Sequence, residues 1–177
     1  MTSPSTPLRR SVAQVLAIVL IFVSAAMGIA VVVVAATVIG SINDQFDRSY
    51  GSAPTEGMTF GVVITIIVSV LTIAFGVWYY VVGSRTESPA VKAAWVLFGI
   101  VVCTAFVTPG WFTGEGWLSD PGGSGMFAWF VFVKLIPTWL ATVSLTLAIA
   151  KVVTFLAAAL ALSWAHSQAA RRKLRAG

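Results

Sequence analysis

The sequence contains very little charge. Asp, Glu, Lys and Arg make up 10% of its 177 residues, against roughly 25% in a typical soluble domain. Two long stretches, 12–42 and 58–83, have no ionised side chain at all. Apolar residues make up 58% of the chain, and a soluble fold of that composition would expose larger apolar patches than a monomer tolerates. The shortage of charge excludes an ordinary soluble domain and indicates an integral membrane protein.

The chain also lacks the residue alternation of membrane β-strands, in which polar and apolar residues alternate over about ten positions. Residues 29–36, for example, are apolar without interruption. Roughly 20 apolar residues cross a bilayer core as a helix, and a helix satisfies its backbone hydrogen bonds internally. We therefore predict an all-α integral membrane protein, with four transmembrane helices forming a bundle.

Residues that commonly carry chemistry are scarce. The single cysteine, Cys103, excludes an intramolecular disulfide, and the single histidine, His166, excludes a bis-histidine haem within one chain. The six acidic residues lie outside the long apolar stretches, so a zinc site or a carboxylate-based catalytic pair lacks ligands there. We predict no catalytic residue, no metal site and no cofactor, and a non-enzymatic function.

The apolar stretches divide the chain into a tail, a membrane domain and a second tail. We expect a disordered tail at 1–11, a four-helix membrane domain at 12–166 and a basic tail at 167–177. The expected spans are 12–42, 58–83, 90–108 and 138–165, with residues 127–136 at the interface and Pro137 marking the entry to the last span. An alternative places one span at 127–150 and a surface helix at 152–165. The first apolar run is too long for a cleaved signal peptide, so an uncleaved span is favoured.

The basic residues indicate orientation rather than nucleic-acid binding, although the net charge is +5. With four spans, eight Lys and Arg residues fall on the side of the two termini, and five of the six acids fall on the other side. Basic residues favour the cytoplasmic face, so both termini are expected to be cytoplasmic. The basic C-terminal tail is expected to contact anionic lipid. The composition, with more Arg than Lys, suggests a bacterial inner membrane protein.

Small and hydroxylated residues recur on one face of the second expected span. At steps of three or four residues they share a helical face, and such residues are typical of helix–helix contacts in membranes. The stripe comprises Gly61, Thr65, Ser69, Thr72 and Gly76, continuing to Tyr80 and Gly83. The first span carries small pairs at 24–28 and 36–40, which we expect to pack against this stripe. The stripe is interpreted as a packing face; the alternative is a polar pathway lined by its hydroxyls.

Lys151 is the most unusual residue of the sequence. It lies near the middle of the last expected span, where a charge costs from about 3 kcal/mol upward. Ser144, Ala148 and Thr154 lie on the same side of the helix and predict a protein-facing surface. Lys151 is therefore a candidate intramembrane functional or partner-contact residue. The alternative is that the register differs and that its side chain reaches an interface.

Amphipathic side chains at the ends of the apolar runs are expected to anchor the bundle at the membrane surface. These are Trp111, Trp117, Lys134, Trp164 and His166. The layout, but no motif, resembles small bacterial membrane proteins and some phage holins. We expect a subunit or scaffold of a membrane assembly, as a homo-oligomer or with another membrane subunit. The alternative is a small channel, transporter or holin-like permeabiliser that uses Lys151 and the hydroxyls of Thr65, Ser69 and Thr72.

Overall fold

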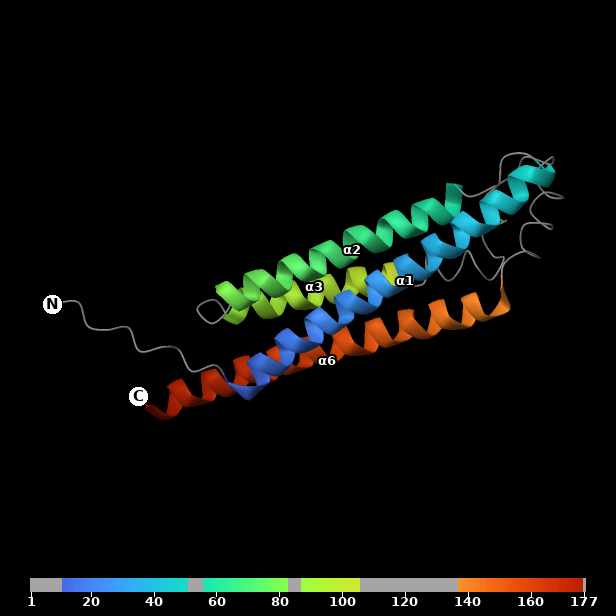
Figure 1. Ribbon diagram of the computed structural model, residues 1–177. Coiled ribbons are helices and arrows are strands. Elements are labelled where there is room, and N and C mark those ends of the chain that lie inside the picture. The colour runs from blue at the N-terminus through green and yellow to red at the C-terminus, as the bar shows by residue number, and fades with distance from the viewer. Residues whose placement is uncertain (1–10, 51–55, 83–86, 106–136, 177) are drawn as a thin grey trace.

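The computed structural model describes residues 11–50, 56–82, 87–105 and 137–176, and the expectation of an all-helical protein is confirmed for this part of the chain (Figure 1). It contains four helices there: α1 (Val12–Tyr50), α2 (Glu56–Val81), α3 (Glu87–Ala105) and α6 (Thr138–Ala176). All four are long and apolar enough to cross a membrane, which indicates a multi-pass membrane protein.

The start of α1 is fixed by a reciprocal pair of hydrogen bonds. The backbone N–H of Gln14 donates to Ser11 Oγ at 3.3 Å, and the backbone N–H of Ser11 donates to Gln14 Oε1 at 2.9 Å. This is a capping box, which satisfies two of the N–H groups that a helix N-terminus leaves without partners. It begins the helix at the point where the apolar run begins.

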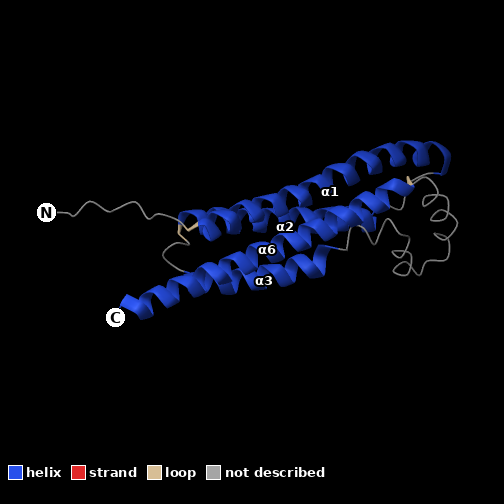
Figure 2. Cartoon of the chain, turned by 90° about the horizontal axis from the view of Figure 1, so that it is seen from below, coloured by secondary structure: helices blue, strands red, loops and turns tan. Residues whose placement is uncertain are grey.

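The helices run alternately up and down and form a ring in cross-section. α1 packs most extensively against α6 and also against α2, while α3 packs against α6 and more weakly against α2. The N-terminal end of α1 and the C-terminal end of α6 lie at the same end of the bundle (Figures 1 and 2). The large buried side chains at the centre include Ile21, Leu140 and Phe155.

The outer surface of the bundle is apolar along the candidate membrane spans. Large apolar side chains are exposed on each of the four helices, for example Val19, Ile67, Val96 and Val153. Lipid is the solvent that suits such a surface, because acyl chains are as apolar as these side chains. The packed interior is consequently where polar side chains would be expected to have a specific role.

The starts of α2 and α3 lie two and three residues before the expected 58 and 90, and two other helix ends differ much more. Residues 43–50, expected in a loop, continue α1, and α6 continues through the expected basic tail as far as Ala176. Charged and amide side chains are compatible with a helix, and α1 meets no glycine or proline between Gly40 and Gly51. At about 1.5 Å per residue, each 39-residue helix is about 58 Å long, so both exceed a hydrocarbon core of roughly 30 Å.

α6 is a single continuous helix that begins directly after Pro137. The backbone N–H of Leu140 donates to the carbonyl oxygen of Pro137 at 2.9 Å, which closes the first turn. The helix contains no break near Ala150, which the alternative division of this region requires. Residues 127–136 lie outside the described part of the chain.

Candidate functional site

The polar stripe of α2 lies in the interior of the bundle. Thr65, Ser69 and Thr72 are 6%, 2% and 0% exposed, and Gly61 and Gly76 are also buried. Each hydroxyl donates to the carbonyl oxygen four residues earlier, at 2.7 to 2.9 Å. These bonds satisfy the donors within α2 and leave the hydroxyl oxygens able to accept a further hydrogen bond.

The buried face of α2 continues to Tyr79 and not, as expected, to Tyr80. Tyr80 is 52% exposed, whereas its neighbour Tyr79 is 5% exposed and packs in the core. At 3.6 residues per turn, Tyr79 lies five whole turns after Gly61 and returns to the same face, whereas Tyr80 is turned by about 100° from it. The expectation that Tyr80 continues the stripe is therefore wrong, and Gly83 lies outside the described residues.

The stripe meets α1 at two glycines. A Cβ built on Gly76 would lie 3.0 Å from Ile21 Cγ2, and a Cβ built on Gly28 would overlap Ser69 Oγ. Small residues at these points allow the two backbones to approach closely. Gly28 and Gly76 thus set the spacing between α1 and α2.

Lys151 reaches the same point on α1. Its Nζ lies 3.3 Å from the position that a Cβ on Gly28 would occupy, and the Lys151 side chain is only 3% exposed. The amine of α6 and the hydroxyl of Ser69 on α2 therefore come together beside Gly28. Gly28, Ser69 and Lys151 each lie close to the midpoint of their candidate membrane span, so the meeting point is deep within the bundle.

Further hydrogen bonds tie α1 to α6 around the lysine. Ser24 Oγ donates to the backbone carbonyl oxygen of Lys151 at 3.0 Å, and Thr154 Oγ1 lies 3.8 Å from Met27 Sδ. Both pairs join residues far apart in the sequence. They hold the backbone of α6 against α1 at Lys151, and so fix the position of the Lys151 Cα from which the side chain extends.

No carboxylate occurs within the candidate membrane spans that surround Lys151. All six acidic residues of the chain fall outside the four candidate membrane spans, and no ion pair of Lys151 occurs within the described residues. Among those residues there is also no group of three His, Cys, Asp or Glu side chains that could hold a metal ion. The site is a buried amine with the hydroxyl of Ser69 nearby.

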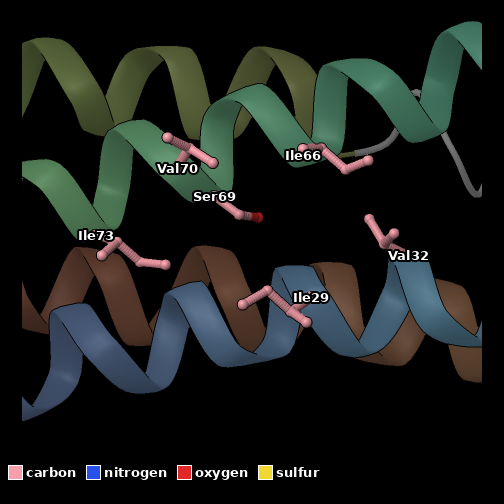
Figure 3. A pocket seen from close by; sticks show the side chains of 6 residues that line it. All are labelled: Ile29, Val32, Ile66, Ser69, Val70 and Ile73. Carbon is pink, nitrogen blue, oxygen red and sulfur yellow. The ribbon is translucent and has the colours of Figure 1, made fainter.

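A pocket of about 120 Å³ opens beside this site between α1 and α2 (Figure 3). Ser69 is among the residues that line it, but the accessible wall is apolar and the other lining residues are aliphatic. They are Ile29 and Val32 on α1 and Ile66, Val70 and Ile73 on α2. The Ser69 hydroxyl thus lies between an apolar pocket and the neighbourhood of Lys151.

Comparison with protein families, curated proteins and solved structures gives no match to this chain. The interpretation of the site therefore depends on its own geometry. A buried amine and hydroxyls can bind an anion or water and can exchange a proton, which are the functions of polar groups in membrane interiors.

The expected interface anchors are only partly described. Trp164 is 60% exposed on α6 and His166 is half-buried nearby. Trp111, Trp117 and Lys134 lie outside the described residues. Cys103 is exposed on α3, away from the site around Lys151.

The packing of the small residues of α1 differs in part from expectation. Ala36 and Gly40 are exposed, and a Cβ on Gly40 would meet nothing within 4 Å, so the expectation that this pair packs against α2 is wrong. Ser24, expected to face α2, bonds to α6 instead. The reason is that α1 lies between α2 and α6 in the ring, so its small residues are shared between two neighbours.

Two contacts between helices, one at the site and one elsewhere in the bundle, were not predicted from the sequence. One is the contact between Gly28 and the Lys151 amine, and the other is the hydrogen bond from Trp95 Nε1 on α3 to Ser163 Oγ on α6 at 3.1 Å. The spacing of Ser24 and Gly28 indicated a packing face, but spacing within one helix does not identify the helix that it contacts. No spacing pattern in the sequence around Ser163 predicts its hydrogen bond to Trp95.

Proposed function

We propose that this membrane protein is non-enzymatic and moves a small solute across the bilayer through the polar interior of its bundle. Lys151 and the hydroxyls of Thr65, Ser69 and Thr72 are the groups that act on the solute. The proposal depends on one observation: the only cation at mid-span depth in the described helices points into the bundle and is 3% exposed. A charged side chain near the middle of a membrane span costs about 3 kcal/mol or more, and residues with that cost usually have a function.

The same burial argues against Lys151 as a contact to another subunit. A partner's carboxylate would need to reach an amine that lies beside Gly28 of the same chain. The surrounding helices exclude an outside side chain in this packing. A function within the chain fits the position of Lys151 better than a contact between chains.

The test is a flux assay on the purified chain in liposomes, with potassium, chloride and glycerol as separate probes. We expect uptake of at least one probe above empty vesicles, and a change of about tenfold in its rate for Lys151→Met, which keeps an unbranched side chain one atom shorter and removes its charge. Lys92→Met is the matched control, because Lys92 is exposed on α3. Absence of flux for all three probes, with insertion verified, would refute transport.

A second candidate is a subunit or scaffold of a membrane assembly. It is favoured by Gly40 and Gly99, whose missing side chains leave open space on the outer surface of α1 and α3. Small residues on a lipid-facing surface suit contact with another helix. The particle mass in a mild detergent distinguishes the two: a homo-oligomer or a stoichiometric partner supports assembly, and a strict monomer opposes it.

The orientation and the lipid contact belong to the same proposal. We infer that both termini are cytoplasmic in a bacterial inner membrane, since Lys and Arg favour that side. The end of α6 carries Arg171, Arg172, Lys173 and Arg175. Clusters of this kind adjoining a membrane helix attract anionic lipid, so the headgroups of that leaflet are the expected partners.

A further inference from the structure

Two buried polar side chains, Ser144 and Lys151, lie on one face of α6, and the Ser144 hydroxyl has no hydrogen-bond partner in the described part of the chain. Ser144 is 0% exposed and its Oγ has no hydrogen bond, and Lys151 lies seven residues further along at 3% exposure. Seven residues are about two helical turns, so both side chains share one face. Between them lies Ala148, also buried at 2%, whose side chain is a single methyl group.

The Lys151 side chain extends toward Ser144. Ser24 of α1 bonds to the backbone carbonyl of Lys151, whereas the Lys151 amine lies beside Gly28, one turn further along α1. Because α1 and α6 are antiparallel (Figure 1), one turn further along α1 is one turn back along α6. The amine is thereby carried toward the N-terminal end of α6, where Ser144 lies.

The charge of this region selects the kind of ligand. An ammonium group attracts anions and repels cations, and no acidic residue occurs in any candidate span to neutralise it. Buried charges are stable when they are paired and hydrogen-bonded. A single negative charge between the amine and the Ser144 hydroxyl would provide both the pairing and the missing hydrogen bond.

We propose that Lys151 Nζ and Ser144 Oγ bind a small monovalent inorganic anion of the halide type inside the bundle. The inference rests on the proposed transport function and specifies its solute. A small ion is favoured because the Lys151 amine packs directly against Gly28 of α1, and Ala148, a small buried residue, lies between the two polar groups on α6. An organic anion would bring a body for which this contact leaves no space.

The test measures chloride binding by the full-length protein in detergent, from the line width of the chloride NMR signal. The wild type is expected to broaden the signal, with bromide competing. Lys151→Met is expected to abolish the excess broadening, and Ser144→Ala to weaken binding by about ten- to a hundredfold, as for loss of one hydrogen bond to a charged group.

Two control variants separate the site from surface charge and from general polarity. Lys92→Met removes an exposed cation, and Thr146→Ala removes a hydroxyl of α6 that bonds to the carbonyl of Thr142 in its own helix. Both are expected to bind chloride like the wild type. Helix content and elution volume establish that each variant is folded. If Lys151→Met does not fold, Ser144→Ala and Lys151→Arg, which preserves the charge, carry the test.

Several outcomes would overturn the proposal. They are absence of excess broadening in the folded wild type, retention of broadening in Lys151→Met, equal losses in Lys92→Met, and unchanged binding in Ser144→Ala. The outcome also separates this inference from transport. Chloride binding without flux refutes transport and retains the anion site, whereas Lys151-dependent flux without chloride binding retains transport and refutes the anion.

Discussion

At the scale of single residues, Gly28 is the position on which the site depends. It has no side chain where Ser69 of α2 and Lys151 of α6 both approach α1. Any larger residue would occupy the space that brings these two groups together. The hydroxyl of Ser69 is also held in place by its bond to the carbonyl oxygen of Thr65 at 2.7 Å, so it cannot move aside without losing that bond.

Replacement of Gly28 by alanine tests this close approach. Gly28→Ala is expected to lower the free energy of unfolding by about 1–3 kcal/mol, the usual cost of overpacking a well-packed interior. Unfolding by SDS in mixed micelles measures the change. Gly40→Ala is the matched control, because open space surrounds Gly40, and it should not destabilise the protein.

A double substitution identifies the clashing atom. Ser69→Ala removes the Oγ that a Cβ at position 28 would overlap, so it should recover much of the stability lost in Gly28→Ala. Residues in contact show such non-additivity, whereas distant ones do not. If the changes in unfolding free energy of the two single variants simply add in the double variant, Ser69 Oγ is not the atom that a Cβ at position 28 overlaps.

At the scale of elements, α6 has a continuous buried face that packs against two other helices. Its buried residues recur at steps of three and four along its length, including Leu140, Ser144, Lys151, Phe155 and Leu162. This is the spacing that keeps one face of a helix against its neighbours in a bundle. α6 is also the helix that packs extensively against both α1 and α3, so the face with Lys151 is the face that joins the elements.

Phe155 is the largest fully buried side chain of this face, and its truncation tests the contribution of α6 packing. Phe155→Ala is expected to cost about 2–5 kcal/mol of unfolding free energy, because the cavity loses van der Waals contacts on every side. Val153→Ala on the same helix is the control, since Val153 is 59% exposed. Equal effects of the two variants, measured by SDS unfolding, would show that this face of α6 is not the core.

At the scale of the whole molecule, the two ends of the bundle differ in charge. The end formed by the start of α3 and the end of α6 carries Lys92 and Arg171, whereas the far end of α1 carries Asp44 (Figure 1). Because Lys and Arg favour the cytoplasmic face, this difference predicts that the end with Lys92 and Arg171 faces the cytoplasm.

Cysteine labelling tests this direction. In a Cys103→Ser background, Ser88→Cys and Gln168→Cys are expected to react with an impermeant maleimide from the same face of the membrane, and Asp44→Cys from the opposite face. All three native residues are exposed, so access in the folded protein is not limited by packing. Reaction of Ser88→Cys and Asp44→Cys from one face would contradict the arrangement of α1, α2 and α3.

The sequence by itself determined the class of the protein and its helices. Long apolar stretches without charge are costly in water and must form internally hydrogen-bonded helices in lipid, and this is a local property of each stretch. The same holds for Pro137, which cannot donate a hydrogen bond to a preceding turn and precedes the start of α6. The steps of three and four residues also indicated a shared face for Ser144, Ala148 and Lys151, all of which are buried.

Only the tertiary structure decided which faces meet. Periodicity within one helix states that a face is buried but not against which helix, so it could not assign Ser24 to α6 or place Gly40 on the outer surface. It also could not show that the amine of Lys151 lies beside Gly28 and within the reach of Ser69. Contacts between helices depend on the order of the ring and on the relative heights of the helices, which are set by the packing of all four together.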